Sequence, residues 1–227
     1  MTPRGPTSVT FAILPVKRFE AAKGRLGELA GGTRRALAES MLTDVLMALR
    51  RTAAIDEVLL VTSEPAADAI GRSYGARVIE DTEEDGQSVA AMIGVDYALE
   101  AGADRVLLVP GDCPALDPAE LTALLAAPVV GRSVTLVADR HGTGTNALVL
   151  APPDVMKPAF GEDSRVRHEA AAAAAGAPCA VEQVPTLALD VDTLEDLAEL
   201  RRLLAERRGG AAHTRGMLSR LAGRERG

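Results

Sequence analysis

The sequence predicts an α/β fold built on a largely parallel sheet, and two observations carry that prediction. Short apolar runs rich in Val, Ile and Leu, such as residues 9–14 and 57–62, have the length of buried strands. Between them lies a stretch with apolar side chains at helical spacing, which begins near Thr33 and ends at Arg50 and Arg51. Strands that alternate with helices indicate parallel strand pairs joined by right-handed crossovers.

The alternation continues along the chain, and several helix starts carry a capping residue. Ser88 and Ser164 can each cap a helix. Asp117 and Pro118, with Glu120, form a capping-box pattern. We therefore expect strands over residues 9–14, 57–62, 78–79, 106–109, 134–138, 147–150 and 179–185, and helices over residues 33–51, 64–70, 88–97, 118–127, 165–176 and 194–207.

Length and composition favour one domain and limit its partners. We expect a single domain over residues 1–208 and a flexible basic tail over residues 209–227, for which a partner-binding helix is the alternative. The core must be aliphatic, because 47% of the residues are apolar but there is no Trp and there are only three Phe. A net charge of −7 argues against a general nucleic-acid surface, so an anionic ligand needs a local basic pocket.

The chain shows no signal for export or membrane insertion. Cys113 and Cys179 form neither a metal-ligand spacing nor a disulfide framework, which fits a reducing compartment. The apolar run near the start is too short for a signal peptide, and no stretch approaches the roughly 20 apolar residues of a membrane span. We therefore expect a cytoplasmic protein without a membrane or nucleic-acid partner.

Residues 105–114, R-V-L-L-V-P-G-D-C-P, place one carboxylate at the end of a buried strand. Pro110 and Gly111 stop the apolar run, and Asp112 follows at the carboxyl end, where ligands bind in open α/β sheets. Asp112 is therefore a candidate metal ligand or acid/base residue. The alternative is that its carboxylate only stabilises the turn.

A basic loop follows the first strand. Lys17, Arg18, Lys23 and Arg25 all lie within this loop. Cations directly after a strand of an α/β fold are typical of phosphate binding, because they meet the ligand at the carboxyl edge of the sheet. A solvated basic loop is the alternative.

Two later loops hold glycine and polar residues that a ligand could approach. Gly86 and Ser88 stand directly before a predicted helix and could approach a nucleotide, although the neighbouring carboxylates are also typical of a solvated loop. Residues 139–146 are rich in Gly and Thr but follow a strand without opening a helix. They therefore match neither dinucleotide-binding nor Walker-type loops, and a hairpin turn is the alternative.

Polar residues also gather at the start of the helix predicted from residue 165. They are Gly161, Ser164, Arg165 and His168. A helix N-terminus with such neighbours suits an anion. Ser164 as an N-cap explains the start of the helix without any ligand, and this alternative stays open.

Two carboxylates stand close together near the end of the domain. In extended chain the side chains alternate, so Asp190 and Asp192 point the same way and Val191 points to the other face. Like charges on one face repel unless a cation lies before them, and oxygen ligands favour Mg²⁺. The alternative, in which Asp192 and Thr193 cap the next helix, accounts for only one of the two carboxylates.

Taken in order, these motifs resemble those of the guanylyltransferases of coenzyme F-420 biosynthesis, which activate 2-phospho-L-lactate or phosphoenolpyruvate with GTP. The resemblance extends to about residue 204, and six motifs in one order make it specific. They are P-V-K at 15–17 with K-G-R-L at 23–26, V-T-S at 61–63, P-G-D-C-P at 110–114, T-G-T-N at 143–146, F-G-E-D-S at 160–164 with His168, and D-V-D-T at 190–193.

The resemblance implies a three-layer Rossmann-like nucleotidyltransferase fold with a mixed, mostly parallel sheet, related to GT-A glycosyltransferases and molybdopterin guanylyltransferases. The chain differs from the molybdopterin branch because it lacks a glycine-rich loop after the first strand and has a lysine-based loop there. It also differs from many archaeal members after Gly86, where Gln87 and Ser88 stand in place of an expected Asn.

The resemblance further implies a role for each motif in the transfer of GMP from GTP to the acid. Lys17, Lys23 and Asp112 would act in catalysis, with Mg²⁺ as the cofactor. The implied contacts are Asp112, Asp190 and Asp192 for the metal; Thr145, Gly161, Ser164 and His168 for the acid; and Lys17, Lys23, Arg25, Ser63, Gly86 and Ser88 for the nucleotide.

The richness in Ala, Arg and Gly resembles the actinobacterial branch of this family, which is associated with phosphoenolpyruvate. We therefore expect GTP and phosphoenolpyruvate as substrates, with 2-phospholactate as the alternative acid. A molybdopterin-type or sugar-phosphate nucleotidyltransferase and a non-catalytic nucleotide-binding regulator are more distant alternatives. A homodimer remains open.

Overall fold

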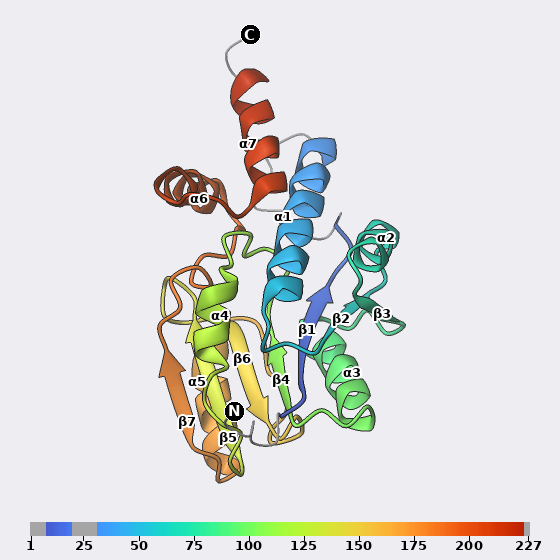
Figure 1. Cartoon of the computed structure of the whole chain (residues 1–227), viewed down its shortest axis with the longest axis vertical. Helices are drawn as coiled ribbons and strands as arrows, with labels where there is room; N and C mark the ends of the chain where they lie inside the picture. Colours follow the sequence, from blue (N-terminus) through green and yellow to red (C-terminus); the bar gives the residue numbers. More distant parts are fainter. Residues whose placement is uncertain (1–7, 20–30, 225–227) are drawn as a thin grey trace, which may run out of the picture.

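The computed structural model describes residues 8–19 and 31–224, which form a seven-stranded sheet with helices on both faces (Figure 1). The strand order is β3-β2-β1-β4-β6-β5-β7, in which β6 runs antiparallel to β4 and β5 and the other neighbouring pairs are parallel. The strands are β1 (Thr10–Val16), β2 (Glu57–Thr62), β3 (Arg77–Glu80), β4 (Arg105–Leu108), β5 (Ser133–Ala138), β6 (Thr145–Ala151) and β7 (Cys179–Glu182). The helices are α1 (Gly31–Arg51), α2 (Pro65–Ser73), α3 (Gln87–Glu100), α4 (Pro118–Leu124), α5 (Ser164–Ala174), α6 (Leu194–Glu206) and α7 (Ala212–Arg224).

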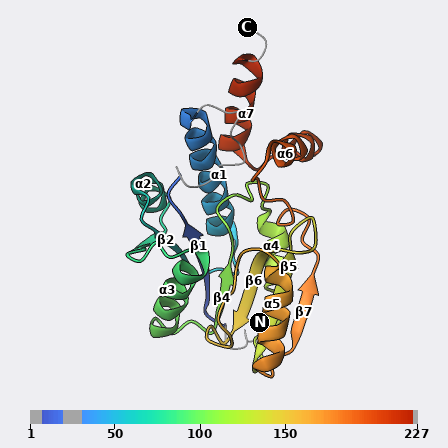
Figure 2. The same ribbon diagram turned by 180° about the vertical axis from the view of Figure 1, so that it is seen from behind.

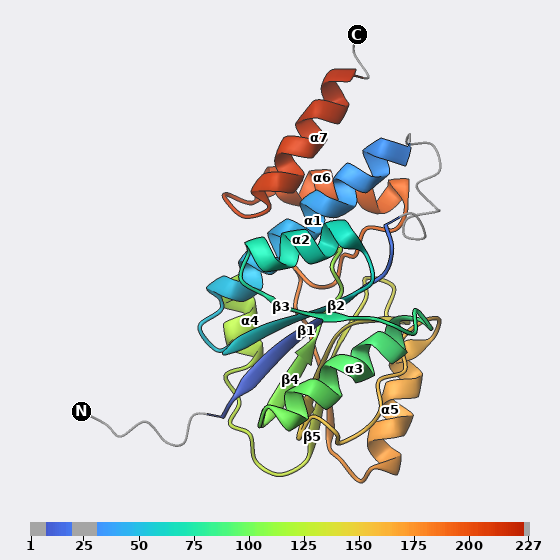
Figure 3. The same ribbon diagram turned by 90° about the vertical axis from the view of Figure 1, so that its right-hand side faces the viewer.

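Alternate side chains of β1 enter two different cores. Phe11 and Ile13 pack in the core shared with α3 and α5, whereas Ala12 and Leu14 pack in the core shared with α1, α2 and α4. Figure 3 shows α1 and α2 on one side of the sheet and α3 on the other, and Figure 2 shows α3 and α5 on the same face. The predicted α/β class and the mixed, mostly parallel sheet are therefore confirmed.

A third apolar cluster extends the fold beyond the edge of the sheet. Leu37 and Met41 of α1 pack with Leu189 and Val191, and the same cluster includes buried leucines of α6 and α7. Figures 1 and 3 show α6 and α7 next to α1 at this end of the molecule. The cluster thus supports the segment that contains Asp190 and Asp192.

The flexible tail expected over residues 209–227 is not what the structure shows for residues 212–224. This segment forms α7, and Met217, Leu218 and Leu221 are buried in the third cluster. The start of α7 is capped by Asp44, a buried residue of α1. Its carboxylate accepts hydrogen bonds from the backbone N–H groups of His213 (3.1 Å) and Thr214 (2.7 Å). The sequence of the tail alone does not predict this cap, because the carboxylate lies far away along the chain.

Two of the predicted caps are also wrong. The N-cap of α3 is Gly86, and Ser88 lies inside that helix, where its hydroxyl accepts a hydrogen bond from Phe160 N at 2.9 Å. The N-cap of α5 is Asp163 in the left-handed region, with Ser164 as the first helical residue. The Ser88 hydroxyl is therefore used by the distant Phe160 backbone and not by a local cap, and the start of α5 is fixed locally, where Ser164 N donates to Gly161 O.

The predicted Asp117 cap is confirmed, but the capping box is not formed. The Asp117 carboxylate accepts from Ala119 N at 2.8 Å. Glu120 instead turns to the chain before the D-V-D motif, where its Oε2 accepts from the backbone N–H (3.1 Å) and the hydroxyl (2.7 Å) of Thr186.

Over the part of the chain that the structure describes, no helix is both long and apolar enough to cross a membrane.

We predict that Asp44→Ala loosens α7. The substitution leaves two backbone N–H groups at the start of α7 without their acceptor, so the free energy of unfolding should fall by about 1–2 kcal/mol. Urea denaturation measures this change. Asp96→Ala, which removes an exposed aspartate of α3, is the matched control and should change stability by less than about 0.5 kcal/mol. Equal effects of the two substitutions would contradict the capping role of Asp44.

Candidate functional site

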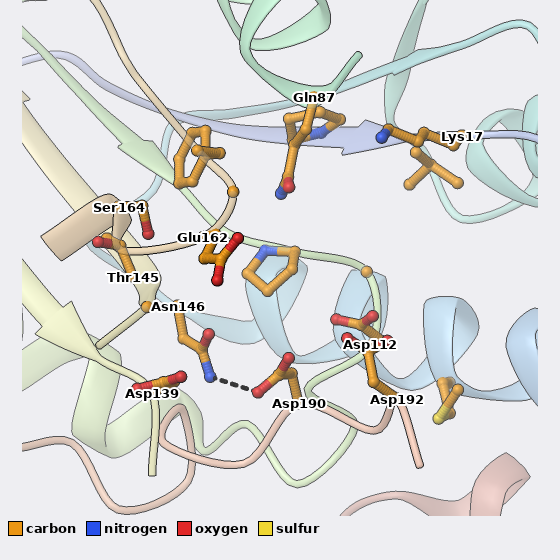
Figure 4. A pocket seen from close by; sticks show the side chains of 18 of the residues that line it. Lys17, Gln87, Asp112, Asp139, Thr145, Asn146, Glu162, Ser164, Asp190 and Asp192 are labelled. Atoms are coloured by element: carbon orange, nitrogen blue, oxygen red, sulfur yellow. Dashed lines mark hydrogen bonds between the residues drawn. The ribbon is translucent and has the colours of Figure 1, made fainter. Parts of the chain in front are cut away.

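A cleft of about 720 Å³ lies at the carboxyl ends of β1 and β4 (Figure 4). Lys17 follows β1 directly, and Asp112 follows β4 after a Pro-Gly turn. Because β6 runs antiparallel to β4, its first residue, Thr145, reaches the same edge of the sheet. This is the edge at which open α/β sheets bind ligands, so the cleft is the candidate active site.

The segment that carries Asp190 and Asp192 is joined directly to the turn that carries Asp112. Val191 N donates a hydrogen bond to Asp112 O at 3.1 Å, and Val191 itself is fully buried. Leu187 and Leu189 are buried as well, whereas Asp190 and Asp192 line the cleft. The predicted alternation of side chains is confirmed, although the segment is not part of the sheet.

Asn146 also holds the segment that carries Asp190 and Asp192. Its Nδ2 donates to Leu187 O at 2.8 Å and to Asp190 Oδ1 at 3.1 Å, the bond drawn in Figure 4. Cys113 adds a thiol hydrogen bond to the same Leu187 carbonyl at 3.7 Å. The T-G-T-N motif contains Asn146, but its partners became visible only with β6 in place.

The electrostatic state of Asp190 shows how closely the acidic groups interact. Its pKa is raised from 3.8 to about 6, first by burial and then by the negative charges of Asp112 and Asp192, and the hydrogen bond from Asn146 offsets part of this rise. Burial and like charges nearby both favour the neutral, protonated form of a carboxyl group. The surroundings of Asp190 therefore favour a positive ligand.

The carboxylates alone do not form a complete metal-binding cluster. Within residues 8–19 and 31–224, no group of three or more His, Cys, Asp or Glu side chains lies close enough together to hold a metal ion. Figure 4 shows Asp112 and Asp192 next to each other and Asp190 on the side towards Asn146. A cation at this place would therefore need further ligands from a substrate or water.

Lys17 is the cation of the cleft wall that the structure describes, and in Figure 4 it lies with Gln87 across from the aspartates. The other two cations predicted to hold phosphates, Lys23 and Arg25, fall in residues 20–30 and lie outside the described residues.

A third part of the cleft wall combines the start of β6 with the start of α5. Thr145, Gly161 and Ser164 all line it, as the sequence predicted. Gly161 has φ +114°, a conformation that favours glycine, and its carbonyl accepts from Ser164 N at 3.1 Å. Arg165 N donates to Thr143 O at 3.1 Å, so the T-G-T-N loop and the start of α5 are joined. The first turn of α5 therefore faces the cleft with its positive dipole end.

Several predicted contact residues lie outside the cleft wall. His168 is fully buried behind Thr145, and the Arg165 side chain pairs with Glu169 at 3.0 Å. Ser63 hydrogen bonds to Glu84. Gly86 caps α3, and Ser88 binds the Phe160 backbone. The structure thus brings together the predicted metal residues and three of the four acid residues, but it gives His168 and Ser88 other partners.

The cleft wall also contains polar residues to which the sequence assigned no contact. They are Gln87, Asp139, Asn146, Glu162 and Asp163. Asp139 Oδ1 accepts from Thr143 N at 2.9 Å and so shapes the T-G-T-N loop. Glu162 and Asp163 follow Gly161 directly and are carried to the cleft by the same loop.

Comparison with known proteins gives consistent results over nearly the whole chain. The family model described as guanylyl transferase, CofC like, matches residues 10–221. A protein of Conexibacter woesei named phosphoenolpyruvate guanylyltransferase is 58% identical over 214 residues, which cover 93% of this chain and 96% of that protein. A protein of the same name from Sphaerobacter thermophilus is 41% identical over 192 residues, which cover 84% of this chain and 92% of that protein.

A solved structure shows the same fold at much lower identity. The cytidylyltransferase from Leptospira borgpetersenii aligns with a TM-score of 0.60 and 13% identity, covering 96% of this chain and 95% of that one. The likeness confirms the predicted nucleotidyltransferase-like α/β fold.

We predict that protonation of His168 destabilises the fold in acid. Burial, with a smaller effect of the Arg167 charge, lowers its pKa from 6.5 to about 4. The unfolded chain therefore binds a proton that the folded chain does not bind between these values. The stability contribution is complete above pH 6.5 and is lost as the pH falls to 4, by on the order of 3 kcal/mol. Urea denaturation at pH 7, 6, 5 and 4 measures the slope.

The His168→Asn variant isolates this contribution. Its free energy of unfolding should fall less steeply between pH 6.5 and 4 than that of the wild type, because all other titrating groups are common to both. His141→Asn, at an exposed histidine, is the matched control and should keep the wild-type slope. Parallel curves for wild type and His168→Asn would show that His168 does not titrate in this way.

Proposed function

Because the chain belongs to the family of CofC-like guanylyl transferases, we propose that it transfers GMP from GTP to phosphoenolpyruvate. The products are enolpyruvoyl-2-diphospho-5'-guanosine and pyrophosphate, and the reaction serves coenzyme F-420 biosynthesis. One observation carries this proposal in the structure. A single cleft joins the three aspartates, Lys17 and the N-terminus of α5, which are the kinds of group that two phosphorylated substrates require.

We place the phosphorylated acid at the start of α5. The Thr145 hydroxyl, the Ser164 side chain and the backbone at Gly161 line this part of the cleft, and the N-terminus of α5 turns its positive dipole end to an anion. The positive φ of Gly161 explains why glycine stands at this position, because any side chain there would be strained.

We place the triphosphate of GTP between Lys17 and the aspartates. Lys17 would balance phosphate charge, with Lys23 and Arg25 as further candidates on residues 20–30. Gln87, at the start of α3, is the described polar side chain next to Lys17 in Figure 4 and is a candidate contact for the nucleoside. The start of α3 would then be shaped by Gly86, Ser63 and Ser88. These residues would support the nucleotide site near this end without contacting the nucleotide from the cleft wall.

The residues present fit Mg²⁺ as a cofactor. Asp112, Asp190 and Asp192 offer only oxygen donors, and a cation would offset both the burial and the neighbouring negative charge that raise the pKa of Asp190. Mg²⁺ usually takes one or two carboxylates and completes its shell with substrate phosphates and water, which suits a site without three converging ligands. When bound, the ion would neutralise charge that develops on the transferring phosphoryl group.

The reaction needs positioning more than acid/base chemistry. A phosphate oxygen of the acid attacks the α-phosphorus of GTP, a new phosphoanhydride bond forms, and the bond between the α- and β-phosphates breaks to release pyrophosphate. The nucleophile is already an anion, so no side chain has to remove a proton from it. The protein contributes the in-line arrangement of the two substrates and the groups that stabilise charge.

The choice between the two acids rests on the relatives. Both proteins compared above are named for phosphoenolpyruvate, and the more similar one is 58% identical over nearly the full length. A biosynthetic enzyme that uses GTP and phosphoenolpyruvate would act in the cytoplasm. A homodimer stays a prediction.

We predict that the purified protein releases pyrophosphate from GTP and Mg²⁺ in the presence of phosphoenolpyruvate. Mass spectrometry should detect the guanylylated acid, and 2-phospho-L-lactate should give a kcat/KM at least about tenfold lower, equivalent to about 1.4 kcal/mol. Molybdopterin or sugar phosphates should give no product. Pyrophosphate release with phospholactate alone would identify the other acid, and no release with either would contradict the proposal.

We predict that Asp190→Asn and Asp192→Asn each lower kcat on the order of 100-fold or more while the thermal unfolding transition is kept. The substitutions preserve size and remove one charge. Binding of Mn²⁺ in the presence of GTP, measured by electron paramagnetic resonance, should weaken in parallel. Asp154→Asn, at an exposed aspartate, should leave both properties unchanged. Wild-type Mn²⁺ affinity in both cleft variants would exclude these residues as metal ligands.

A further inference from the structure

His168 is the buried titratable residue at the cleft for which the proposed reaction has no use. It lies on α5 directly behind Thr145, is fully buried and does not reach the cleft wall. His168 therefore cannot contact the acid directly. Its two ring nitrogens nevertheless each have one partner, and these two partners belong to the two segments that would hold the acid.

The partner of Nε2 determines the tautomer of the ring. Ala159 N–H points at Nε2 with a distance of 2.8 Å, and a backbone N–H can only donate. Nε2 must therefore be the unprotonated nitrogen. A neutral imidazole then carries its hydrogen on Nδ1. The lowered pKa of His168, about 4, agrees with a neutral ring at pH 7.

The tautomer in turn determines what Thr145 does. His168 Nδ1 lies 3.0 Å from Thr145 Oγ1, so the ring donates and the hydroxyl oxygen accepts. Thr145 lines the cleft, and among the described residues no further hydrogen bond of its hydroxyl is present. The hydroxyl hydrogen is therefore available to an acceptor in the cleft, and an anionic oxygen is the strongest such acceptor.

The same ring fixes the loop that leads to Gly161. Nε2 holds Ala159 N, and the next residue is held by the bond from Phe160 N to Ser88 Oγ. The Phe160 ring packs edge-on against His168, with the ring centroids 5.2 Å apart. One buried side chain thus connects the start of β6 with the loop before α5.

We propose that His168 is a positioning residue for the phosphorylated acid: its Nδ1–H makes the Thr145 hydroxyl a donor directed at an oxygen of the acid, while its Nε2 holds the loop before Gly161. This inference rests on the proposed function, because it takes the acid to bind beside Thr145. Without the ring, the Thr145 hydroxyl can rotate and donate to a protein acceptor, and the acid then loses a directed hydrogen bond.

Two substitutions separate the two hydrogen bonds of the ring. In His168→Asn the side-chain amide takes the place of Nδ1 and still donates to Thr145, but Ala159 N loses its acceptor. In His168→Gln the side-chain oxygen takes the place of Nε2 and still accepts from Ala159 N, but Thr145 loses its donor. Each variant is therefore the matched control of the other.

His168→Gln should raise the KM for phosphoenolpyruvate about tenfold, the usual effect of one lost hydrogen bond to a charged group. His168→Asn should stay within about threefold of the wild type, and the KM for GTP should change less than twofold in both variants. Thr145→Val should raise the acid KM at least as much as His168→Gln, and the double variant should be no worse than Thr145→Val, because the two residues act through one hydroxyl.

Nitrogen-15 NMR of the unsubstituted protein tests the same idea without mutation. The ring nitrogen shifts of His168 at pH 7 should report a hydrogen on Nδ1 and none on Nε2. A hydrogen on Nε2, or a charged ring, would overturn the inference even if both variants failed to fold. Equal acid KM values for His168→Gln and His168→Asn would overturn it as well.

The Thr145→Val variant distinguishes a failure of the role proposed for His168 from a failure of the proposed acid site. If it raises the acid KM and His168→Gln does not, the role of His168 fails and the proposed acid site stands. If Thr145→Val leaves the acid KM unchanged in an active enzyme, the acid does not bind beside Thr145, and both the site and the role of His168 fail.

Discussion

The hydrogen bond from Val191 N to Asp112 O holds the candidate site together. It joins the turn after β4 to the segment between β7 and α6, and it places Asp112 beside Asp190 and Asp192. Burial and, after it, the charges of Asp112 and Asp192 raise the pKa of Asp190 from 3.8 to about 6, which corresponds to roughly 3 kcal/mol against its charged form. The arrangement therefore needs a compensating source of stability.

That stability comes from the alternate residues of the same segment. Leu187, Leu189 and Val191 are buried, and each such side chain contributes roughly 1.5–3 kcal/mol when it leaves water. Their sum, on the order of 5–9 kcal/mol as an upper estimate, is of the size needed to offset the cost at Asp190. The period of two in L-A-L-D-V-D thus serves both purposes, since the apolar residues anchor the segment and the acidic residues face the cleft.

This division explains what the sequence could predict. Asp112, Asp190 and Asp192 were found because strand ends and side-chain alternation are local patterns. Asn146 was not assigned a role because its two acceptors, Leu187 O and Asp190 Oδ1, are more than 40 residues away and meet it only when β6 pairs antiparallel with β4. Ser88 and Glu120 were given local caps, but each binds a distant backbone N–H. The α7 helix depended in the same way on Asp44, a buried residue of α1.

The charge of the cleft explains why its two ends differ. Its described wall contains six carboxylates, from Asp112, Asp139, Glu162, Asp163, Asp190 and Asp192, and one cation, Lys17. Two phosphorylated substrates add further negative charge, so the aspartate end is unfavourable for a nucleotide unless cations accompany it. The end at α5 also carries Glu162 and Asp163, but the donors it offers to an anion are neutral: the hydroxyls of Thr145 and Ser164 and the dipole of α5. Neutral donors bind an anion only when they are directed at it, and for this reason a buried, neutral His168 that orients Thr145 suits this end better than another charge would.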